Sequence, residues 1–209
     1  RQIGEGAAVA LISDAGTPLV SDPGYRLVKQ AAQQSLPVIP LPGASAPLAA
    51  LVGSGLGTGN FTFCGFLPNK TRARQSRIAE LADEAATLMF FESPNRLKAA
   101  LQDLSEGLGP QRPATVCREL TKMYETFHRG TLEHLLTEFE ALERIRGEIV
   151  IVVEGAPQNV ADQPEEVRQQ LLDALKTMKT KQAANHVAQA TGLSKQDLYK
   201  RALELQKEP

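Results

Sequence analysis

Apolar residues gather in short runs along the chain, and the polar residues between them mark out alternating strands and helices. The runs at residues 7–13 (AAVALIS) and 37–41 (PVIPL) each lead into a turn rich in glycine and proline, which is typical of a buried strand followed by a loop. Residues 25–35 have helical composition, and residues 47–52 are small and apolar, like a helix packed on a sheet. This alternation predicts a parallel sheet with crossover helices.

A second group of strands and helices follows the glycine-rich segment 53–60 (GSGLGTGN), where we place a domain boundary. Further apolar runs predict strands at residues 61–66, 87–91, 115–118 and 148–154. Amphipathic stretches predict intervening helices at residues 72–82 and 97–108. We therefore expect an α/β fold with two domains, at residues 1–57 and 58–157.

Three short amphipathic helices are predicted near the end of the chain. Residues 165–178 and 181–190 each place their apolar side chains on one face, and a third helix is marked by Leu198, Leu203 and Leu205. Gly192 makes the turn before that helix, and Ser194 is its candidate N-cap, with Asp197 reaching back in a capping box. This spacing predicts a helix-turn-helix-like domain over residues 162–209.

The composition says more about the cellular compartment of the protein than about its binding partner. The formal net charge of -1 gives no overall attraction to a polyanion, so a nucleic-acid contact requires a local basic patch. Cys64 and Cys117 lie in separate apolar runs, which favours two buried thiols in a reducing compartment over a disulfide framework. No apolar run approaches the roughly 20 residues that span a bilayer. We expect a cytoplasmic protein.

Two glycine-bearing turns follow the first two predicted strands. They are DAGTPLVSDPG at residues 14–24 and PLPGASA at residues 40–46. Glycine lets a ligand approach the backbone, and α/β proteins bind ligands at the carboxyl ends of their strands. The first turn lacks both the GxGxxG pattern and the Walker lysine, which argues against a pyrophosphate site. Ser45 is equally well explained as a ligand contact or as a helix N-cap.

Charged residues follow two later strands, in FFESPNR at residues 90–96 and CRELTKMYE at residues 117–125. The resulting pocket candidates are Glu92, Arg118, Glu119, Lys122 and Glu125. Exposed ion pairs are the alternative explanation for each of them. The histidines, His128, His134 and His186, lack metal-ligand spacing, and we expect no metal site.

Taken in order, these segments resemble the tetrapyrrole methylase superfamily, and within it the branch that methylates a ribose 2′-hydroxyl of small-subunit ribosomal RNA. The similarity rests on SDAGTPLVSDPGYRLV, PLPGASA, GFLPNKTRARQ, FFESPNRL, RELTKMYET and RGEIVIVVEG. It covers essentially the whole chain, including the C-terminal helices that porphyrin-modifying relatives generally lack. The family's first strand, its Pro-Ile-Gly-Asn loop and an acidic-Asp-Thr-Arg motif have no counterpart, so we expect them upstream of Arg1.

The resemblance implies two α/β domains with S-adenosylmethionine in the cleft between them, and usually a homodimer. Its implied substrate is a cytidine in the decoding region of 16S ribosomal RNA, in free RNA or in the small ribosomal subunit. The cofactor contacts that it implies are Asp14, Ala15, Gly16, Thr17, Leu19, Val20, Ser45, Ala46, Phe91 and Glu92.

Methyl transfer to a hydroxyl is an in-line displacement in which the protein mainly positions the reactants. We expect Glu119 or Glu125 to act as base or orienting group and Lys122 as the electrostatic group. Expected RNA contacts are the basic residues Lys70, Arg72, Arg74, Arg77, Lys195, Lys200 and Arg201. The alternative is that these cations simply lie on solvent-exposed helix faces and bind nothing.

Two other functions stay open at this point. A methyltransferase of the same superfamily that acts on a tetrapyrrole (a porphyrinogen) would leave the C-terminal helices and the FLPNKTRARQ segment unexplained. A non-catalytic nucleic-acid-binding protein would use its helix-turn-helix for RNA or DNA and its α/β part to sense a ligand.

Overall fold

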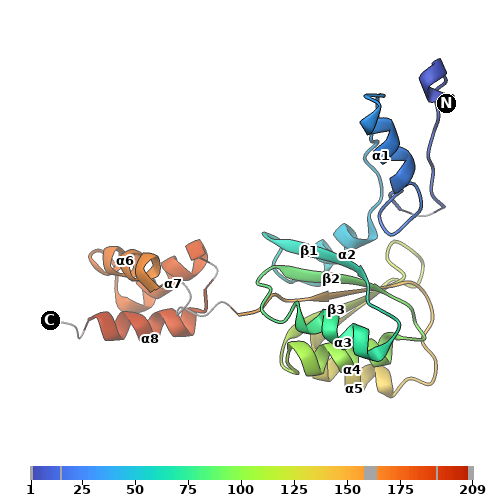
Figure 1. Cartoon of the computed structure of the whole chain (residues 1–209). Coiled ribbons are helices and arrows are strands. Elements are labelled where there is room, and N and C mark those ends of the chain that lie inside the picture. The colour runs from blue at the N-terminus through green and yellow to red at the C-terminus, as the bar shows by residue number, and fades with distance from the viewer. Residues whose placement is uncertain (1, 15, 158–163, 192, 207–209) are drawn as a thin grey trace. The chain divides into compact units, whose positions relative to one another are not determined.

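The computed structural model describes residues 2–14, 16–157, 164–191 and 193–206. The chain divides into two compact units, Arg1–Glu154 and Gly155–Pro209, and Figure 1 labels most of their elements. The domain boundary expected at residues 57 and 58 lies inside the first unit and stays a prediction. Within the described residues, no helix is long and apolar enough to cross a membrane.

A five-stranded sheet forms the centre of the first unit, with the strand order β1-β2-β5-β3-β4. Its strands are β1 (Phe61–Phe66), β2 (Thr87–Glu92), β3 (Pro113–Arg118), β4 (Thr126–Thr131) and β5 (Ile149–Val153). Only β1 and β2 run parallel, and the other neighbours are antiparallel. The central β5 is buried at every residue, which explains its uninterrupted apolar sequence.

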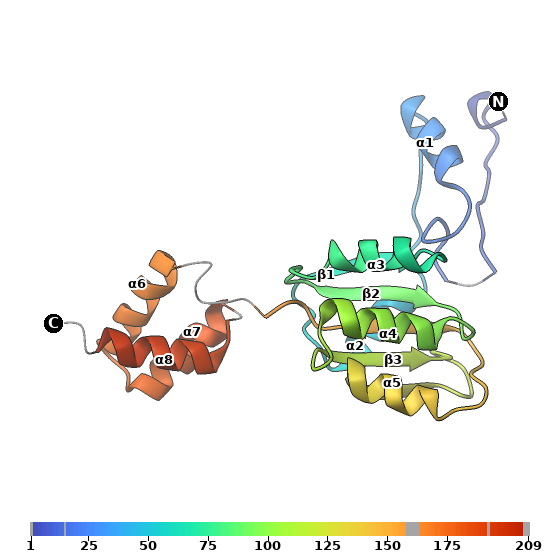
Figure 2. The same cartoon turned by 60° about the horizontal axis from the view of Figure 1, so that its bottom comes forward.

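Helices cover both faces of this sheet. On one face lie α3 (Thr71–Ala79), α4 (Leu97–Leu108) and α5 (Leu132–Glu140), whose apolar side chains share a core with Leu88, Phe90 and Ile151. The other face packs against α2 (Ala46–Ser54) through Met89, Cys117 and Val152. Figure 2 shows α3, α4 and α5 in front of the strands and α2 behind them.

Two of the predicted strands are absent. The N-terminal part of the chain forms a short 3-10 helix, η1 (Ile3–Glu5), and α1 (Tyr25–Gln33), but residues 7–13 and 37–41 contain no strand. The side chains of Ile12, Ile39 and Leu41 are 80–85% exposed. A strand needs a hydrogen-bonding neighbour, and neither segment pairs with another strand among the described residues. The predictions of these two strands, and of the parallel sheet that they were expected to form, were wrong.

The second unit consists of three helices, as expected from the sequence. They are α6 (Pro164–Leu175), α7 (Thr180–Thr191) and α8 (Lys195–Leu205). Their apolar faces meet in a separate core around Leu171, Val187 and Leu198. The Ser194 hydroxyl accepts a hydrogen bond from the Asp197 N–H at 3.4 Å, which confirms the predicted N-cap. Gly192, expected to make the turn, lies outside the described residues.

Candidate functional site

A cavity of about 410 Å³ opens in the first unit, where the loops near residues 20, 45, 93, 120 and 147 come together. This volume lies in the range of about 300–1,000 Å³ typical of small-molecule sites. Its lining is formed by Gly16, Thr17, Val20, Ser21, Asp22, Ser45, Ala46, Pro47, Phe66, Phe91, Glu92, Ser93, Pro94, Leu120, Gly147, Glu148, Ile149 and Val150.

The two glycine-bearing turns meet at this cavity. Thr17 donates a hydrogen bond from its hydroxyl to the Ala44 carbonyl at 2.8 Å. Gly16 has a φ of +69°, a conformation that favours glycine, and a Cβ there would lie 3.7 Å from the same carbonyl. Ser45 precedes α2 but makes no side-chain capping hydrogen bond. Its hydroxyl is therefore available to a ligand, which favours the first of the two explanations for Ser45.

Strand β1 supports the first turn and supplies an aromatic wall. Gly65 has a φ of +67° at an irregularity in the β1 register, and a Cβ there would lie 3.6 Å from the Ser21 hydroxyl. The rings of Phe66 and Phe91 follow, with centroids 5.5 Å apart, and Phe63 packs on Phe91 at 4.9 Å. These rings give the cavity one apolar face.

Glu92 places a buried carboxylate at the end of β2, beside this apolar face. Its side chain has no exposed surface. One oxygen, Oε1, accepts a hydrogen bond from the Ser93 N–H at 2.7 Å, whereas Oε2 has no hydrogen-bond partner. Loss of hydration raises the pKa of this carboxyl, since burial outweighs the opposing hydrogen bond from Ser93. The cavity therefore contains a strong acceptor, Oε2, that accepts no hydrogen bond from the described residues and has only an ion-pair contact with Arg96.

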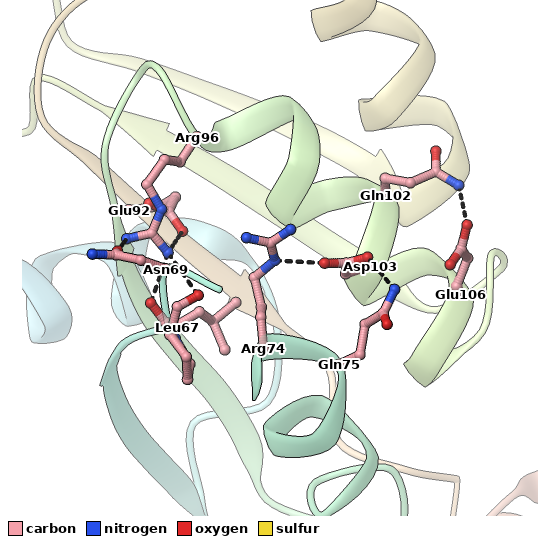
Figure 3. Close-up of polar contacts among 10 residues, drawn as sticks. Leu67, Asn69, Arg74, Gln75, Glu92, Arg96, Gln102, Asp103 and Glu106 are labelled. Atoms are coloured by element: carbon pink, nitrogen blue, oxygen red, sulfur yellow. Dashed lines mark hydrogen bonds and ion pairs between the residues drawn. The ribbon is translucent and has the colours of Figure 1, made fainter. Parts of the chain in front are cut away.

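Arg96 connects this carboxylate to the loop between β1 and α3, as Figure 3 shows. Its Nη2 lies 3.3 Å from Glu92 Oε2 and donates to the carbonyls of Leu67 at 2.7 Å and Pro68 at 3.3 Å. Its Nη1 donates to the Asn69 side chain, and its buried Nε has no partner. A single guanidinium thus fixes the start of the basic segment 70–77 relative to the cavity.

The expected cofactor residues are largely brought together. Seven of them line the cavity, namely Gly16, Thr17, Val20, Ser45, Ala46, Phe91 and Glu92. Asp14 and Leu19 are in the same loop but do not line it, and Ala15 lies outside the described residues. The cavity residues that sequence reasoning missed include Phe66, Leu120 and residues 147–150, where β5 begins. The motif RGEIVIVVEG marks that start, but only the antiparallel position of β5 brings it to the cavity.

The three expected catalytic residues do not line the cavity. Glu119 Oε1 accepts hydrogen bonds from the Glu148 N–H and from Lys122 Nζ, both at 2.9 Å. These bonds, the first above all, lower the pKa of the Glu119 carboxyl. Lys122 also lies 3.0 Å from a Glu148 carboxylate oxygen. Glu125 accepts from the Thr121 N–H at 2.7 Å. These contacts hold a loop in which Glu119 and Thr121 have φ of +52° and +63°.

The expected RNA contacts separate into free, paired and buried cations. Lys70, Arg72, Lys195 and Lys200 are exposed, and Arg77 and Arg201 pair with Glu80 and Glu204 on their own helices. Arg74 is only 5% exposed and lies 2.5 Å from Asp103 of α4, as Figure 3 shows. A guanidinium buried against a carboxylate is not available to phosphate, so the prediction for Arg74 was wrong. No metal-binding group of three His, Cys, Asp or Glu occurs within the described ranges.

Comparisons with known proteins agree with this architecture. Residues 1–136 match the family of Tetrapyrrole (Corrin/Porphyrin) Methylases, and residues 161–206 match the RsmI C-terminal HTH domain. Among solved structures, the methyltransferase CobJ superposes with a TM-score of 0.54 at 23% identity, covering 74% of this chain and 67% of CobJ. That likeness concerns the fold alone. The expected fold class, an α/β methylase fold with a helix-turn-helix-like C-terminal domain, is confirmed.

Curated relatives give a narrower group. Ribosomal RNA small subunit methyltransferase I of Mesorhizobium japonicum is 49% identical over 200 residues, covering 96% of this chain and 68% of the relative. The protein of the same name from Synechocystis is 43% identical, covering 96% of this chain and 73% of the relative. The chain therefore belongs to the tetrapyrrole methylase family, in the group whose members carry the name ribosomal RNA small subunit methyltransferase I.

Proposed function

We propose that this chain binds S-adenosylmethionine in the cavity of the first unit and methylates the ribose 2′-hydroxyl of a cytidine in 16S ribosomal RNA. The names of the relatives support the reaction and the RNA. The observation that carries the assignment to this cavity is the buried Oε2 of Glu92, which accepts no hydrogen bond from the described residues and lies beside two glycine-bearing turns. The tetrapyrrole substrate is less well supported, because residues 161–206 match a domain named for the RNA enzyme.

The residues present suit the cofactor. The rings of Phe66 and Phe91 offer an apolar surface to an adenine ring, and Gly16 lets a ligand approach the backbone closely. Glu92 Oε2 can accept a hydrogen bond from a sugar hydroxyl or an ammonium group, and the uncapped Ser45 hydroxyl can donate or accept one. The bound cofactor would supply a methyl group activated by a sulfonium.

The protein's own contribution is to position the acceptor hydroxyl and to receive its proton. We keep Glu119 or Glu125 as base or orienting group and Lys122 as electrostatic group, as proposals. The lowered pKa of Glu119 makes it a weak base, which supports an orienting role. In that role, the Glu119–Lys122–Glu148 contacts hold Leu120 and Glu148 at the cavity wall.

RNA would be held by local basic groups, because the net charge is -1. The exposed Lys70 and Arg72 follow the loop that Arg96 fixes beside the cavity, and Arg77 lies on the same helix. We propose 16S ribosomal RNA or the small ribosomal subunit as the partner. The cytoplasmic location and the homodimer stay predictions.

The first test measures cofactor binding by calorimetry and tritium transfer from labelled cofactor to small subunits isolated from cells that lack this methylation. We expect label in 2′-O-methylcytidine. The substitution Glu92→Gln removes a charged acceptor and lowers cofactor affinity by about 10- to 100-fold. Glu106→Gln, the same change at an exposed carboxylate on α4, is the matched control and leaves affinity unchanged.

Other outcomes select the other functions. Label in a porphyrinogen and none in RNA would identify a tetrapyrrole methyltransferase. Cofactor binding with no methyl acceptor would favour the ligand-sensing protein. Equal cofactor affinity for Glu92→Gln and Glu106→Gln would remove Glu92 from the site.

A further inference from the structure

A second cavity lies wholly within the C-terminal unit, between α7 and α8. Its volume is about 480 Å³, and its lining residues are Lys181, Ala184, Lys195, Gln196 and Tyr199. Ala184 is fully buried, whereas Tyr199 is 40% exposed. The cavity therefore combines two ammonium groups, an amide and an accessible aromatic ring.

The charges of this unit leave the cavity positive. Three cations of the unit pair with carboxylates three residues before or after them, in the contacts Arg168–Glu165, Lys176–Asp173 and Arg201–Glu204. Lys181 and Lys195 make no ion pair with any described residue, and both are exposed. Asp197, in the first turn of α8, pairs with neither lysine in this part of the chain. An anion at the cavity would thus meet two uncompensated ammonium groups.

The shape of RNA restricts how this unit can bind it. A helix-turn-helix reads DNA by placing its second helix in the major groove. The major groove of an RNA duplex is deep and narrow and does not admit side chains for reading bases. Proteins instead recognise RNA at unpaired nucleotides, whose bases stack on aromatic side chains while cations contact the phosphates. The cavity between α7 and α8 carries both kinds of group.

We propose that this cavity binds one unstacked nucleotide of a single-stranded RNA segment. Lys181 and Lys195 contact its phosphates, Tyr199 stacks on its base, and the Gln196 amide meets the base edge. The inference rests on the proposed function in taking RNA as the ligand, but it concerns a site separate from the methyl-transfer cavity.

The test measures fluorescence anisotropy of a short labelled single-stranded oligoribonucleotide with the whole chain. We expect Lys181→Ala and Lys195→Ala each to reduce the slope of log affinity against log salt by about 0.7, the value for one phosphate contact on a single strand. Lys176→Ala is the matched control from the same unit, because Lys176 pairs with Asp173 at 2.6 Å. It leaves the slope unchanged.

Tyr199 provides an independent arm. Tyr199→Leu removes the stacking surface and weakens binding by about 10- to 100-fold, whereas Tyr199→Phe keeps the ring and binds as the wild type does. Circular dichroism establishes that each variant retains its helices. Tighter binding of duplex than of single-stranded RNA, or wild-type affinity for Tyr199→Leu, would overturn the proposal in favour of a groove-binding or non-binding unit.

The same set of proteins separates this proposal from the proposed function. A wild-type chain that methylates RNA but whose Lys181, Lys195 and Tyr199 variants bind the oligoribonucleotide normally would overturn the nucleotide site alone. A wild-type chain that binds the oligoribonucleotide through these residues but methylates no RNA would overturn the proposed reaction alone.

Discussion

At the scale of single residues, Glu92 gives folding stability and ligand affinity opposite dependences on pH. Its raised pKa means that the folded chain favours the neutral carboxyl more than the unfolded chain does. The stability that this carboxyl contributes to the folded state is therefore fully present below the ordinary pKa of a glutamate. It is lost as the pH rises through the raised pKa of Glu92. A ligand that donates to the carboxylate needs the charged form, so its affinity rises over the same pH range.

We expect Glu92→Gln to remove both pH dependences. Urea unfolding and cofactor calorimetry at a series of pH values between mildly acidic and neutral measure them. The glutamine variant is at least as stable as the wild type at neutral pH, because no buried charge has to be desolvated. Parallel rather than opposite pH trends in the wild type would contradict this account of Glu92.

Arg96 illustrates why a guanidinium and an ammonium are not equivalent. We expect Arg96→Lys to keep the charge near Glu92 but to lose bonds to Leu67, Pro68 and Asn69, lowering the free energy of unfolding by about 1–3 kcal/mol. The KM for RNA rises more than kcat falls, since the loop that carries Lys70 is no longer fixed. Arg77→Lys, at an exposed pair with Glu80, stays within about 0.5 kcal/mol of the wild type.

Individual site residues were predictable where the signal is local. Gly16, Thr17, Ser45 and Glu92 lie at or shortly after the ends of apolar runs, and all four line the cavity, although only the run before Glu92 forms a strand. The buried thiol expected at Cys117 was also correct, and burial raises its pKa to about 12, whereas Cys64 is half-buried. Residues 147–150 were not predictable, because they lie at the start of β5 rather than after its end, and they reach the cavity only through antiparallel pairing.

At the scale of elements, a buried ion pair joins α3 to α4. Arg74 and Gln75 on α3 both donate to Asp103 on α4, at 2.5 and 3.0 Å. We expect Asp103→Ala to lower the free energy of unfolding by about 3–5 kcal/mol, because it leaves a buried guanidinium unpaired. The double variant Arg74→Met, Asp103→Leu recovers most of that loss. Urea unfolding measures both, and a mild effect of Asp103→Ala would show that Arg74 finds water.

Elements were predictable in proportion to how regular their sequences are. The range 97–108 was predicted for α4 and observed without change, since its apolar residues repeat at helical spacing. Strand β4 was missed because TFHRGT is largely polar and contains a glycine, as suits an edge strand that pairs only with β3. The strands expected at residues 7–13 and 37–41 show the opposite case, in which an apolar run alone does not make a strand.

At the scale of the whole molecule, the two units have separate hydrophobic cores. We expect two transitions in differential scanning calorimetry. Leu198→Ala removes a fully buried side chain from the C-terminal core and destabilises that unit by about 2–5 kcal/mol. Only one transition moves to lower temperature. A common shift of both transitions would show that the units unfold together.

The balance of positive and negative charges has a kinetic consequence for an enzyme of RNA. With a formal net charge of -1, the protein has no overall positive field to attract phosphates at a distance, so encounters with arbitrary RNA are short and broken by modest salt. Long residence requires several small contacts to be made at once. Such a protein searches quickly among the many RNA surfaces around it and stops only where the shape of the target brings all those contacts together.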